Sequence, residues 1–240
     1  MKREIIKTSD GSSTIYLPDM DETYHSTHGA IQEAEHVFIR NGLHAIDSSW
    51  RLEVNVFEVG YGTGLNALLS MKHNIHSYLN YDSIEAYPVS KDDMGKMRYC
   101  DMVGEEYKVY FDKMTRCPWG KKESLRHGMT LLKIHEKIQD YTLHPGKYDL
   151  IYFDAFGPRA QSEMWKPEIL QKMYDGLQNG GALVTYCANG QFKRDLKSIG
   201  FEIESLPGPP GKREMTRAWK PGDDPEYPIR SLERAPKDQS

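Results

Sequence analysis

The 240-residue sequence has few cysteines, no long apolar run and no excess of basic residues. Its three cysteines, Cys100, Cys117 and Cys187, have neither close pairing nor metal-ligand spacing, which argues against a disulfide scaffold and favours a reducing compartment. No apolar run approaches the roughly 20 residues of a membrane helix, and residues 1–7 lack a signal-peptide core. We therefore expect a soluble cytoplasmic protein with no membrane partner.

The charge balance limits the class of partner. The chain carries 31 lysines and arginines against 35 aspartates and glutamates, a net charge of -4. An indiscriminate nucleic-acid binder usually has a basic excess, so the balance argues against that class but leaves room for one local basic face. The nine histidines show no metal-ligand spacing, and we expect no metal.

From residue 53 onward, strand-like and helix-like apolar patterns alternate, which predicts an α/β fold with a doubly wound, mostly parallel sheet. The least periodic stretch, 104–128, is expected to be an insertion or surface cover. We divide the chain into an N-terminal strand and helix extension (1–50), a core (51–220) and a polar tail (221–240). Strands are expected at 13–17, 54–59, 81–86, 129–134, 148–153, 182–186, 201–205 and 214–219, and helices at 29–39, 63–73, 89–103, 164–177 and 191–199.

A glycine-rich motif follows the strand at 54–59 and opens the next helix. It reads Glu58-Val59-Gly60-Tyr61-Gly62-Thr63-Gly64-Leu65-Asn66. Glycines at such a turn let the backbone approach a ligand closely. The G-x-G-x-G spacing, with an acidic residue two positions before the first glycine, resembles motif I of class I S-adenosylmethionine (SAM) methyltransferases. The alternative is an ordinary glycine-rich turn between a strand and a helix.

Two further carboxylates are expected at strand ends. Glu85 ends the strand at 81–86, where its two oxygens could accept hydrogen bonds from a ribose diol, or it is a solvated charge. Asp154 follows the mostly apolar strand at 148–153, so it either faces the crevice at the carboxyl edge of the sheet or caps the following turn.

A wider set of motifs resembles one family, the MnmC-type methyltransferase domain, which occurs in a bifunctional tRNA-modifying enzyme and as stand-alone MnmD versions. The resemblance spans roughly residues 20–220. Besides the glycine motif, it rests on Tyr24-His25-Ser26, Glu85-Ala86-Tyr87-Pro88, Asp154-Ala155-Phe156-Gly157-Pro158, Glu163-Met164-Trp165, residues 180–186 and Gly208-Pro209-Pro210-Gly211-Lys212-Arg213-Glu214-Met215.

The resemblance implies a class I SAM-dependent methyltransferase with a seven-stranded sheet and helices on both faces. It implies that SAM methylates the exocyclic amine of 5-aminomethyl-(2-thio)uridine at the wobble position of tRNA, giving 5-methylaminomethyl-(2-thio)uridine. The expected partner is the anticodon stem-loop, and a monomer is the default. The chain has no room for the flavin oxidase domain of the bifunctional enzyme.

The resemblance also implies roles for individual residues. Asp154 is expected to be catalytic, orienting the substrate amine in preference to acting as a strong base. Cofactor binding is expected at Glu58, Gly60, Tyr61, Gly62, Thr63, Gly64, Asn66, Glu85, Ala86, Tyr87, His135 and Asp154. Substrate binding is expected at Tyr24, Ser26, Phe156, Pro158, Met164, Trp165, Tyr186, Lys212 and Arg213.

Several of these interpretations have alternatives. Phe156 and Trp165 either stack against the uracil or are ordinary core aromatics, and Lys212 and Arg213 either contact phosphates or form a solvated face. The family places an aspartate after the third strand to meet the adenine amine, but residues 132–136 contain none, so His135 or a backbone carbonyl is expected there. The competing functions are methylation of a small molecule or protein, and non-catalytic binding of a nucleotide or RNA.

Overall fold

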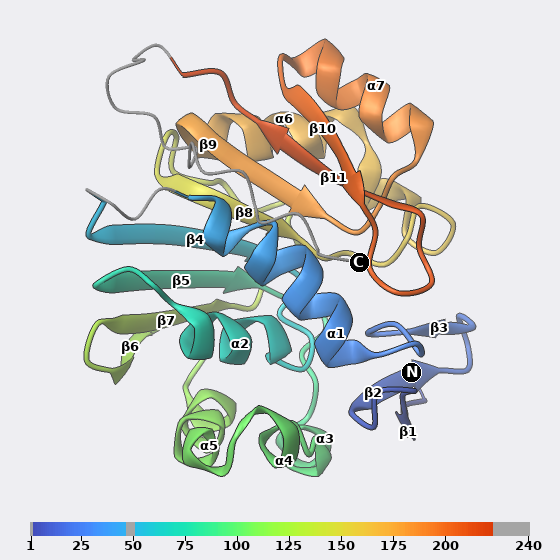
Figure 1. Cartoon of the computed structure of the whole chain (residues 1–240), viewed down its shortest axis with the longest axis vertical. Coiled ribbons are helices and arrows are strands. Elements are labelled where there is room, and N and C mark those ends of the chain that lie inside the picture. Colours follow the sequence, from blue (N-terminus) through green and yellow to red (C-terminus); the bar gives the residue numbers. More distant parts are fainter. Residues whose placement is uncertain (1, 47–50, 223–240) are drawn as a thin grey trace, which may run out of the picture.

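The computed structural model describes residues 2–46 and 51–222, which form two β-sheets and the helices around them (Figure 1). The smaller sheet is antiparallel, with the strand order β1 (Glu4–Lys7), β2 (Ser13–Leu17) and β3 (Glu22–Thr23). The larger sheet has the spatial order β10 (Glu202–Pro207), β11 (Glu214–Trp219), β9 (Leu177–Thr185), β8 (Tyr148–Phe153), β4 (Glu53–Val59), β5 (Tyr78–Ile84), β7 (Met129–Ile134) and β6 (Lys122–Arg126).

The five central strands of the larger sheet, β9, β8, β4, β5 and β7, are parallel. Antiparallel strands β11 and β10 extend one side, and β6 extends the other. The expected doubly wound, mostly parallel sheet is therefore confirmed, but the expected number of seven strands is wrong, because eight are described. The extra strand, β6, lies within 104–128, where its polar sequence has only one buried residue, Leu125.

Helices cover both faces of the larger sheet. One face packs against α1 (Ala30–Ala34), η1 (Glu35–Arg40) and α2 (Leu65–His73), and its core continues into α3 (Lys91–Lys96), α4 (Cys100–Val103) and α5 (Lys108–Arg116). The other face packs against α6 (Pro167–Gly176) and α7 (Gly190–Ile199). Three short 3-10 turns complete the described elements: η2 (Leu43–Ala45), η3 (Glu105–Tyr107) and η4 (Ser162–Trp165).

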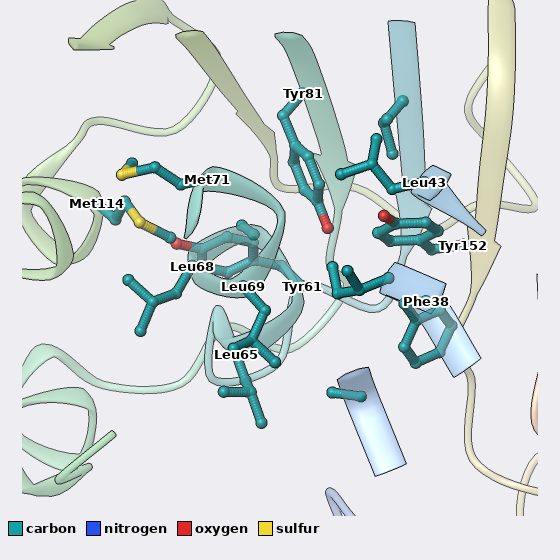
Figure 2. Close-up of a cluster of buried hydrophobic side chains, with 14 of the residues drawn as sticks. Phe38, Leu43, Tyr61, Leu65, Leu68, Leu69, Met71, Tyr81, Met114 and Tyr152 are labelled. Carbon is teal, nitrogen blue, oxygen red and sulfur yellow. The ribbon is translucent and has the colours of Figure 1, made fainter. Parts of the chain in front are cut away.

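Alternation along β4 separates these two cores. Val54 and Val56 belong to the α2 side, whereas Phe57 and Val59 belong to the α6 side, because successive strand residues point to opposite faces. On the α2 side, Figure 2 shows the leucines of α2 beneath the aromatic rings of neighbouring strands, and the ring of Phe38 lies 5.0 Å from that of Tyr152. This packing fixes the start of α2, and with it the glycine-rich motif.

Several helices differ from the expected ones. The segment expected at 29–39 is helical, but its second half is the π-helix η1. The helix expected at 89–103 is two short helices, because Met97 adopts an extended backbone between them. Pro167 is the first residue of α6, so the helix expected from 164 begins there and the preceding residues form η4.

The expected insertion at 104–128 is largely regular structure. Helix α5 buries Phe111 and Met114, three residues apart, against the α2 side of the core, and β6 pairs with β7. Of the expected polar tail, residues 223–240 lie outside the described residues. None of the helices in 2–46 and 51–222 is long and apolar enough to cross a membrane.

A buried lysine joins α5 to the sheet. Lys133 on β7 is 3% exposed, and its ammonium donates to the carbonyl of Met114 at 2.7 Å. The same ammonium lies 5.4 Å from the ring centre of Tyr61 and 5.0 Å from that of Trp119. Burial lowers the pKa of Lys133 to about 8, so the folded state loses this proton before the unfolded chain does.

This shift predicts a pH-dependent stability. Above about pH 8 the folded state carries neutral Lys133 while the unfolded chain stays protonated, so stability should rise with pH. Relative to Lys133→Met, the free energy of unfolding of the wild type should rise by roughly 2 kcal/mol between about pH 7.5 and 9.5. Urea unfolding of both proteins measures this difference, and a difference that does not change with pH would contradict the assignment.

Candidate active site

The carboxyl ends of β5, β4 and β8 meet at one edge of the larger sheet. Val59, the last residue of β4, pairs with Ile84 of β5 and Phe153 of β8, which are also the last residues of their strands. The next residue along each strand therefore emerges at the same level. These three residues are Gly60, Glu85 and Asp154, and they were expected in the site.

Backbone contacts hold these strand ends together. The amide of Gly60 donates to the carbonyl of Ile84 at 2.9 Å, and the amide of Asp154 donates to that of Val59 at 3.0 Å. Gly60 has a φ of 95°, and a Cβ there would lie 2.5 Å from the carbonyl oxygen of Asp154. Glycine is therefore required at position 60 both by its backbone conformation and by this close approach.

A cleft opens at this edge, between the strand ends and the N-terminal segment. The smaller sheet lies on the side of the larger sheet toward which β5 points (Figure 1). The guanidinium of Arg3 donates to the carbonyls of Tyr87 and Pro88 and to the hydroxyl of Tyr24, which joins the N-terminal segment to the strand ends. The cleft is lined by Leu17, Met20, Tyr24, His25, Val59, Gly60, Gly62, Ile84, Glu85, Ala86, Tyr87, Glu136, Ile138, Gln139, Asp154, Ala155, Phe156, Gln161 and Met164.

Strand β5 ends at Ile84, so Glu85 lies just beyond the strand, whereas it was expected within a strand at 81–86. One carboxylate oxygen accepts from the amide of Gly62 at 3.0 Å, and the other accepts from the amide of Tyr87 at 2.8 Å. Each carboxylate oxygen can accept more than one hydrogen bond, so Glu85 retains capacity toward a ligand in the cleft.

A second cavity adjoins the cleft, and we call it the side cavity. It shares Tyr24, His25, Asp154, Ala155 and Phe156 with the cleft, so Asp154 faces both. The rings of Tyr24 and Phe156 meet edge to face at 5.3 Å. Its remaining lining residues are Glu22, Thr23, Ser26, Thr27, Glu33, Gly157, Tyr186 and Lys212.

Lys212 points into the side cavity rather than outward. Its ammonium lies 2.5 Å from a carboxylate oxygen of Glu33 and 3.7 Å from the ring centre of Tyr186. The other oxygen of Glu33 accepts from the amide of Ser26 at 2.9 Å. The expectation that Lys212 contacts phosphates stays a prediction, and its ammonium, on a side chain that is about a third exposed, is already paired with Glu33. Arg213, the next residue, is exposed.

Two expected substrate residues lie elsewhere. Trp165 is buried among Phe153 and Phe192, and its indole nitrogen donates to the carbonyl of Phe156 at 2.8 Å. The geometry therefore supports the alternative that Trp165 is a core aromatic residue, and its hydrogen bond fixes the backbone of Phe156. Pro158 does not line the cleft or the side cavity, whereas Met164 lines the cleft.

Part of the glycine-rich motif also lies behind the cleft. Tyr61 is 4% exposed beside Trp119, and Thr63 is fully buried, with its hydroxyl 2.8 Å from that of Tyr99. Gly64, at a φ of 74°, starts α2 without lining the cleft. Glu58 and Asn66 are buried beneath Asp154. These residues shape the cleft from behind, in contrast to the direct cofactor contact expected of them.

His135 does not line the cleft, so it is not placed to substitute for the missing aspartate. Its exposed ring lies 5.8 Å from that of Trp119. The same loop instead presents Glu136, Ile138 and Gln139 to the cleft. After the strand ends at Ile134, the chain brings these residues to the cleft, where Ile138 is buried and Glu136 and Gln139 are exposed; residue spacing did not indicate this.

Burial changes the acid–base properties of the site. It raises the pKa of Asp154 to about 7, against the effect of a hydrogen bond from Asn66. It also lowers the pKa of His25 to about 4, so this imidazole is neutral at pH 7. The ring of His25 lies 2.9 Å from the hydroxyl of Thr63. Asp154 is therefore a better proton acceptor than an ordinary aspartate.

Two residues of the side cavity were missed by sequence reasoning. His25 was expected only as part of the motif Tyr24-His25-Ser26, and Glu33 was not singled out. Glu33 is buried because the turn carrying Lys212 closes over α1. The signal available in the sequence was a glutamate on an otherwise apolar helix face, but its partner Lys212 lies 179 residues away.

Comparisons with known proteins agree with this geometry. Residues 104–221 match the model of a family described as S-adenosyl-L-methionine-dependent methyltransferase. The bifunctional protein MnmC of tRNA 5-methylaminomethyl-2-thiouridine biosynthesis is 28% identical in Cupriavidus metallidurans, covering 90% of this chain and 34% of that protein. Its Leptospira borgpetersenii counterpart is 27% identical, covering 91% and 35%. The chain thus spans about a third of the length of these curated relatives.

Solved structures show the same fold. MNMC2 from Aquifex aeolicus superposes with a TM-score of 0.73 at 22% identity, covering 92% of this chain and 71% of that chain. Spermidine synthase from Thermotoga maritima superposes with a TM-score of 0.53 at 18% identity, covering 93% and 70%. Both similarities concern the arrangement of the α/β core.

The close approach at Gly60 predicts the effect of adding one methyl group. Gly60→Ala should lower the free energy of unfolding by about 2–4 kcal/mol and abolish SAM binding, because strain and steric overlap fall on the backbone of Asp154. Gly95→Ala is the matched control, since a Cβ at this position in α3 meets nothing within 4 Å. It should stabilise the protein by about 0.5–1 kcal/mol.

Thermal unfolding and SAM titration calorimetry would compare the two variants. Normal SAM affinity in Gly60→Ala would show that the cleft tolerates a displaced strand end, contrary to this account.

Proposed function

Because the chain belongs to the MnmC-type family of SAM-dependent methyltransferases, we propose that it methylates the exocyclic amine of 5-aminomethyl-(2-thio)uridine at the wobble position of tRNA. The product is 5-methylaminomethyl-(2-thio)uridine. The proposal is supported by the names of the curated relatives, which place them in the biosynthesis of this nucleoside. The chain matches only about a third of the length of these relatives, and its residues 104–221 match a family of SAM-dependent methyltransferases. The similarity therefore supports the methyl-transfer step in particular.

The observation that carries the proposal is the position of Asp154 between two cavities. A transferase needs the donor and the acceptor to meet at one point, with the reacting atoms held in line. We assign the cleft to SAM and the side cavity to the modified uridine. Asp154 lines both, so a group bound to its carboxylate lies at their junction.

The cleft fits the chemistry of the cofactor. Gly60 and Gly62 let the backbone form its floor, and Glu85 presents two carboxylate oxygens where a ribose diol would bind. Ala86 and Tyr87 continue the wall beyond Glu85. When bound there, SAM supplies a methyl group on a sulfonium sulfur, which an amine lone pair can attack.

The side cavity fits a cationic acceptor. Three carboxylates line it, from Glu22, Glu33 and Asp154, against the single ammonium of Lys212. A primary alkylamine is mostly protonated at neutral pH, so an acidic pocket attracts it. Aromatic side chains of Tyr24, Phe156 and Tyr186 supply faces against which a uracil splayed from the anticodon loop could stack.

Asp154 has two roles in this mechanism. Its carboxylate orients the amine toward the cleft, and its raised pKa of about 7 lets it accept the proton that the nitrogen must lose. The new bond joins nitrogen to the methyl carbon, and the bond from that carbon to sulfur breaks. Tyr186 fixes the backbone next to Asp154, because its hydroxyl donates to the carbonyl of Ala155 at 2.8 Å.

The first test removes the charge of Asp154. Asp154→Asn should lower kcat by at least about 100-fold, because an amide neither accepts the proton nor holds the ammonium. SAM affinity should stay within about threefold, less than 1 kcal/mol, because the side chain keeps its shape. The assay uses labelled SAM and tRNA carrying 5-aminomethyluridine, followed by analysis of the wobble nucleoside.

Two outcomes of this assay would favour the competing functions. Label appearing in an RNA-free mixture of metabolites or proteins, with none in tRNA, would favour a different methyl acceptor. If the wild type transfers no methyl group, and Asp154→Asn binds SAM and tRNA as the wild type does, a non-catalytic binding module would be favoured.

We also propose that tRNA phosphates contact the face around Arg213. The turn at 208–213 is closed by backbone hydrogen bonds, from Gly208 to the carbonyl of Arg213 at 3.1 Å and from Lys212 to that of Pro209 at 2.9 Å. This turn holds the exposed Arg213 beside the side cavity, because Lys212 and Tyr186 line the same surface depression. A phosphate contact there would position the anticodon loop over the acceptor site.

Arg213→Ala should therefore weaken tRNA binding and reduce the slope of log Kd against log salt by about one phosphate contact. The control is Lys197→Ala, because Lys197 is an exposed cation in the last turn of α7, which runs away from the cleft. Fluorescence anisotropy at several salt concentrations measures both. Equal effects of the two substitutions would contradict a specific contact at Arg213.

A further inference from the structure

Beneath the candidate site, two carboxylates share one amide group. The side-chain nitrogen of Asn66 donates to a carboxylate oxygen of Glu58 at 3.0 Å and to Oδ2 of Asp154 at 2.8 Å. The second oxygen of Glu58 accepts from the hydroxyl of Ser83 at 2.6 Å. These side chains come from β4, α2, β5 and the end of β8, so the chain of contacts ties the central strands to Asp154.

The fold places these groups by simple periodicity. Glu58 follows Val54 and Val56 on the α2 side of β4, where an apolar residue would otherwise fill the core. Asn66 lies in the first turn of α2 and faces the sheet, as does Ser70 one turn later, whose hydroxyl lies 3.1 Å from that of Tyr152. Glu58 and Asn66 are 0% and 2% exposed, so they do not reach the cleft directly.

The arrangement is costly if it serves only stability. Burying a carboxylic acid is unfavourable unless its hydrogen bonds are complete. The carbonyl oxygen of Asn66 is buried and has no hydrogen-bond partner among the described residues, so its desolvation on folding is not compensated. What the arrangement provides is a fixed donor aimed at one oxygen of Asp154.

We infer that Glu58 and Asn66 are positioning residues for methyl transfer. Glu58 fixes the amide of Asn66, and Asn66 binds Oδ2 of Asp154, which leaves Oδ1 to receive the acceptor amine. The inference rests on the proposed function for its kinetic consequences, but the coupling between the two carboxylates exists in the protein alone and is measurable without a substrate.

The electrostatics support a coupled pair. Burial, and to a smaller extent the charge of Asp154, together raise the pKa of Glu58 to about 8, above the value of about 7 for Asp154, so Asp154 ionises first. The hydrogen bond from Asn66 lowers the pKa of Asp154, because it stabilises the carboxylate. Other titratable groups around the pair are Tyr61, Tyr81 and Tyr152 near Glu58, and Glu33, Lys212 and Tyr186 near Asp154.

The direct experiment is a carbon-13 NMR titration of the Asp154 carboxyl group in the substrate-free protein, with Asp154→Asn identifying its signal. In the wild type, the signal should shift mainly near pH 7 and again, more weakly, as Glu58 ionises. In Glu58→Gln, which keeps an oxygen for Asn66, the second step should vanish. In Asn66→Ala, the main step should move upward by roughly one pH unit.

Kinetics then test positioning. Asn66→Ala should lower kcat by roughly 10-fold or more and move the midpoint of the pH–rate profile upward, while SAM Kd and tRNA KM stay within about threefold. Glu58→Ala should behave similarly, and Glu58→Gln should recover most of the rate at neutral pH. Ser70→Ala is the matched control, because it removes a buried polar contact of α2 without touching Asp154.

The results separate this inference from the proposed function. The inference would be overturned, even if tRNA is methylated, if the titration of Asp154 is unchanged in both Glu58→Gln and Asn66→Ala. It would also be overturned if Ser70→Ala changes this titration in the same way as they do. If Asn66→Ala does not fold, the single-step titration in Glu58→Gln still decides the coupling. Absence of tRNA methylation by the wild type, with the NMR shifts as expected, would contradict the proposed function alone.

Discussion

The in-register ends of β5, β4 and β8 position the candidate site. Since Val59 pairs with both Ile84 and Phe153, the residues that follow these three strands are brought to one level at the sheet edge. Gly60 then passes so close to the carbonyl of Asp154 that any side chain would separate the strand ends. The cleft, the carboxylate of Glu85 and the position of Asp154 all depend on this register, which the two hydrophobic cores maintain from opposite faces.

Elements distant in sequence complete the site around this edge. The N-terminal segment brings Tyr24 and His25 over the glycine-rich motif, and Arg3 secures it to the backbone beyond Glu85. From the other end of the chain, Lys212 reaches across to Glu33 on α1. The side cavity is thus enclosed by segments near both ends of the described chain, and its walls combine aromatic faces with an acidic surplus.

The sequence predicted the parts of this site that depend on local pattern. Six mostly apolar residues before Asp154, and a glycine-rich turn after β4, were enough to place both at the carboxyl edge. The burial of Glu58, Asn66 and Trp165 could not be predicted from the motifs, because one motif contains both residues that contact a ligand and residues that only support them. Helix α5 was missed because only Phe111 and Met114 mark its apolar face. The inward direction of Lys212 depends on Glu33, a partner that no local pattern indicates.

We propose that this site joins a methyl donor to the amine of a wobble uridine. Mass spectrometry of wobble nucleosides tests it most directly, using tRNA from a strain lacking this methylation, incubated with the protein and SAM. We expect 5-aminomethyl-(2-thio)uridine to gain one methyl group with the wild type and none with Asp154→Asn. An unchanged wobble nucleoside, with SAM shown to bind, would contradict it.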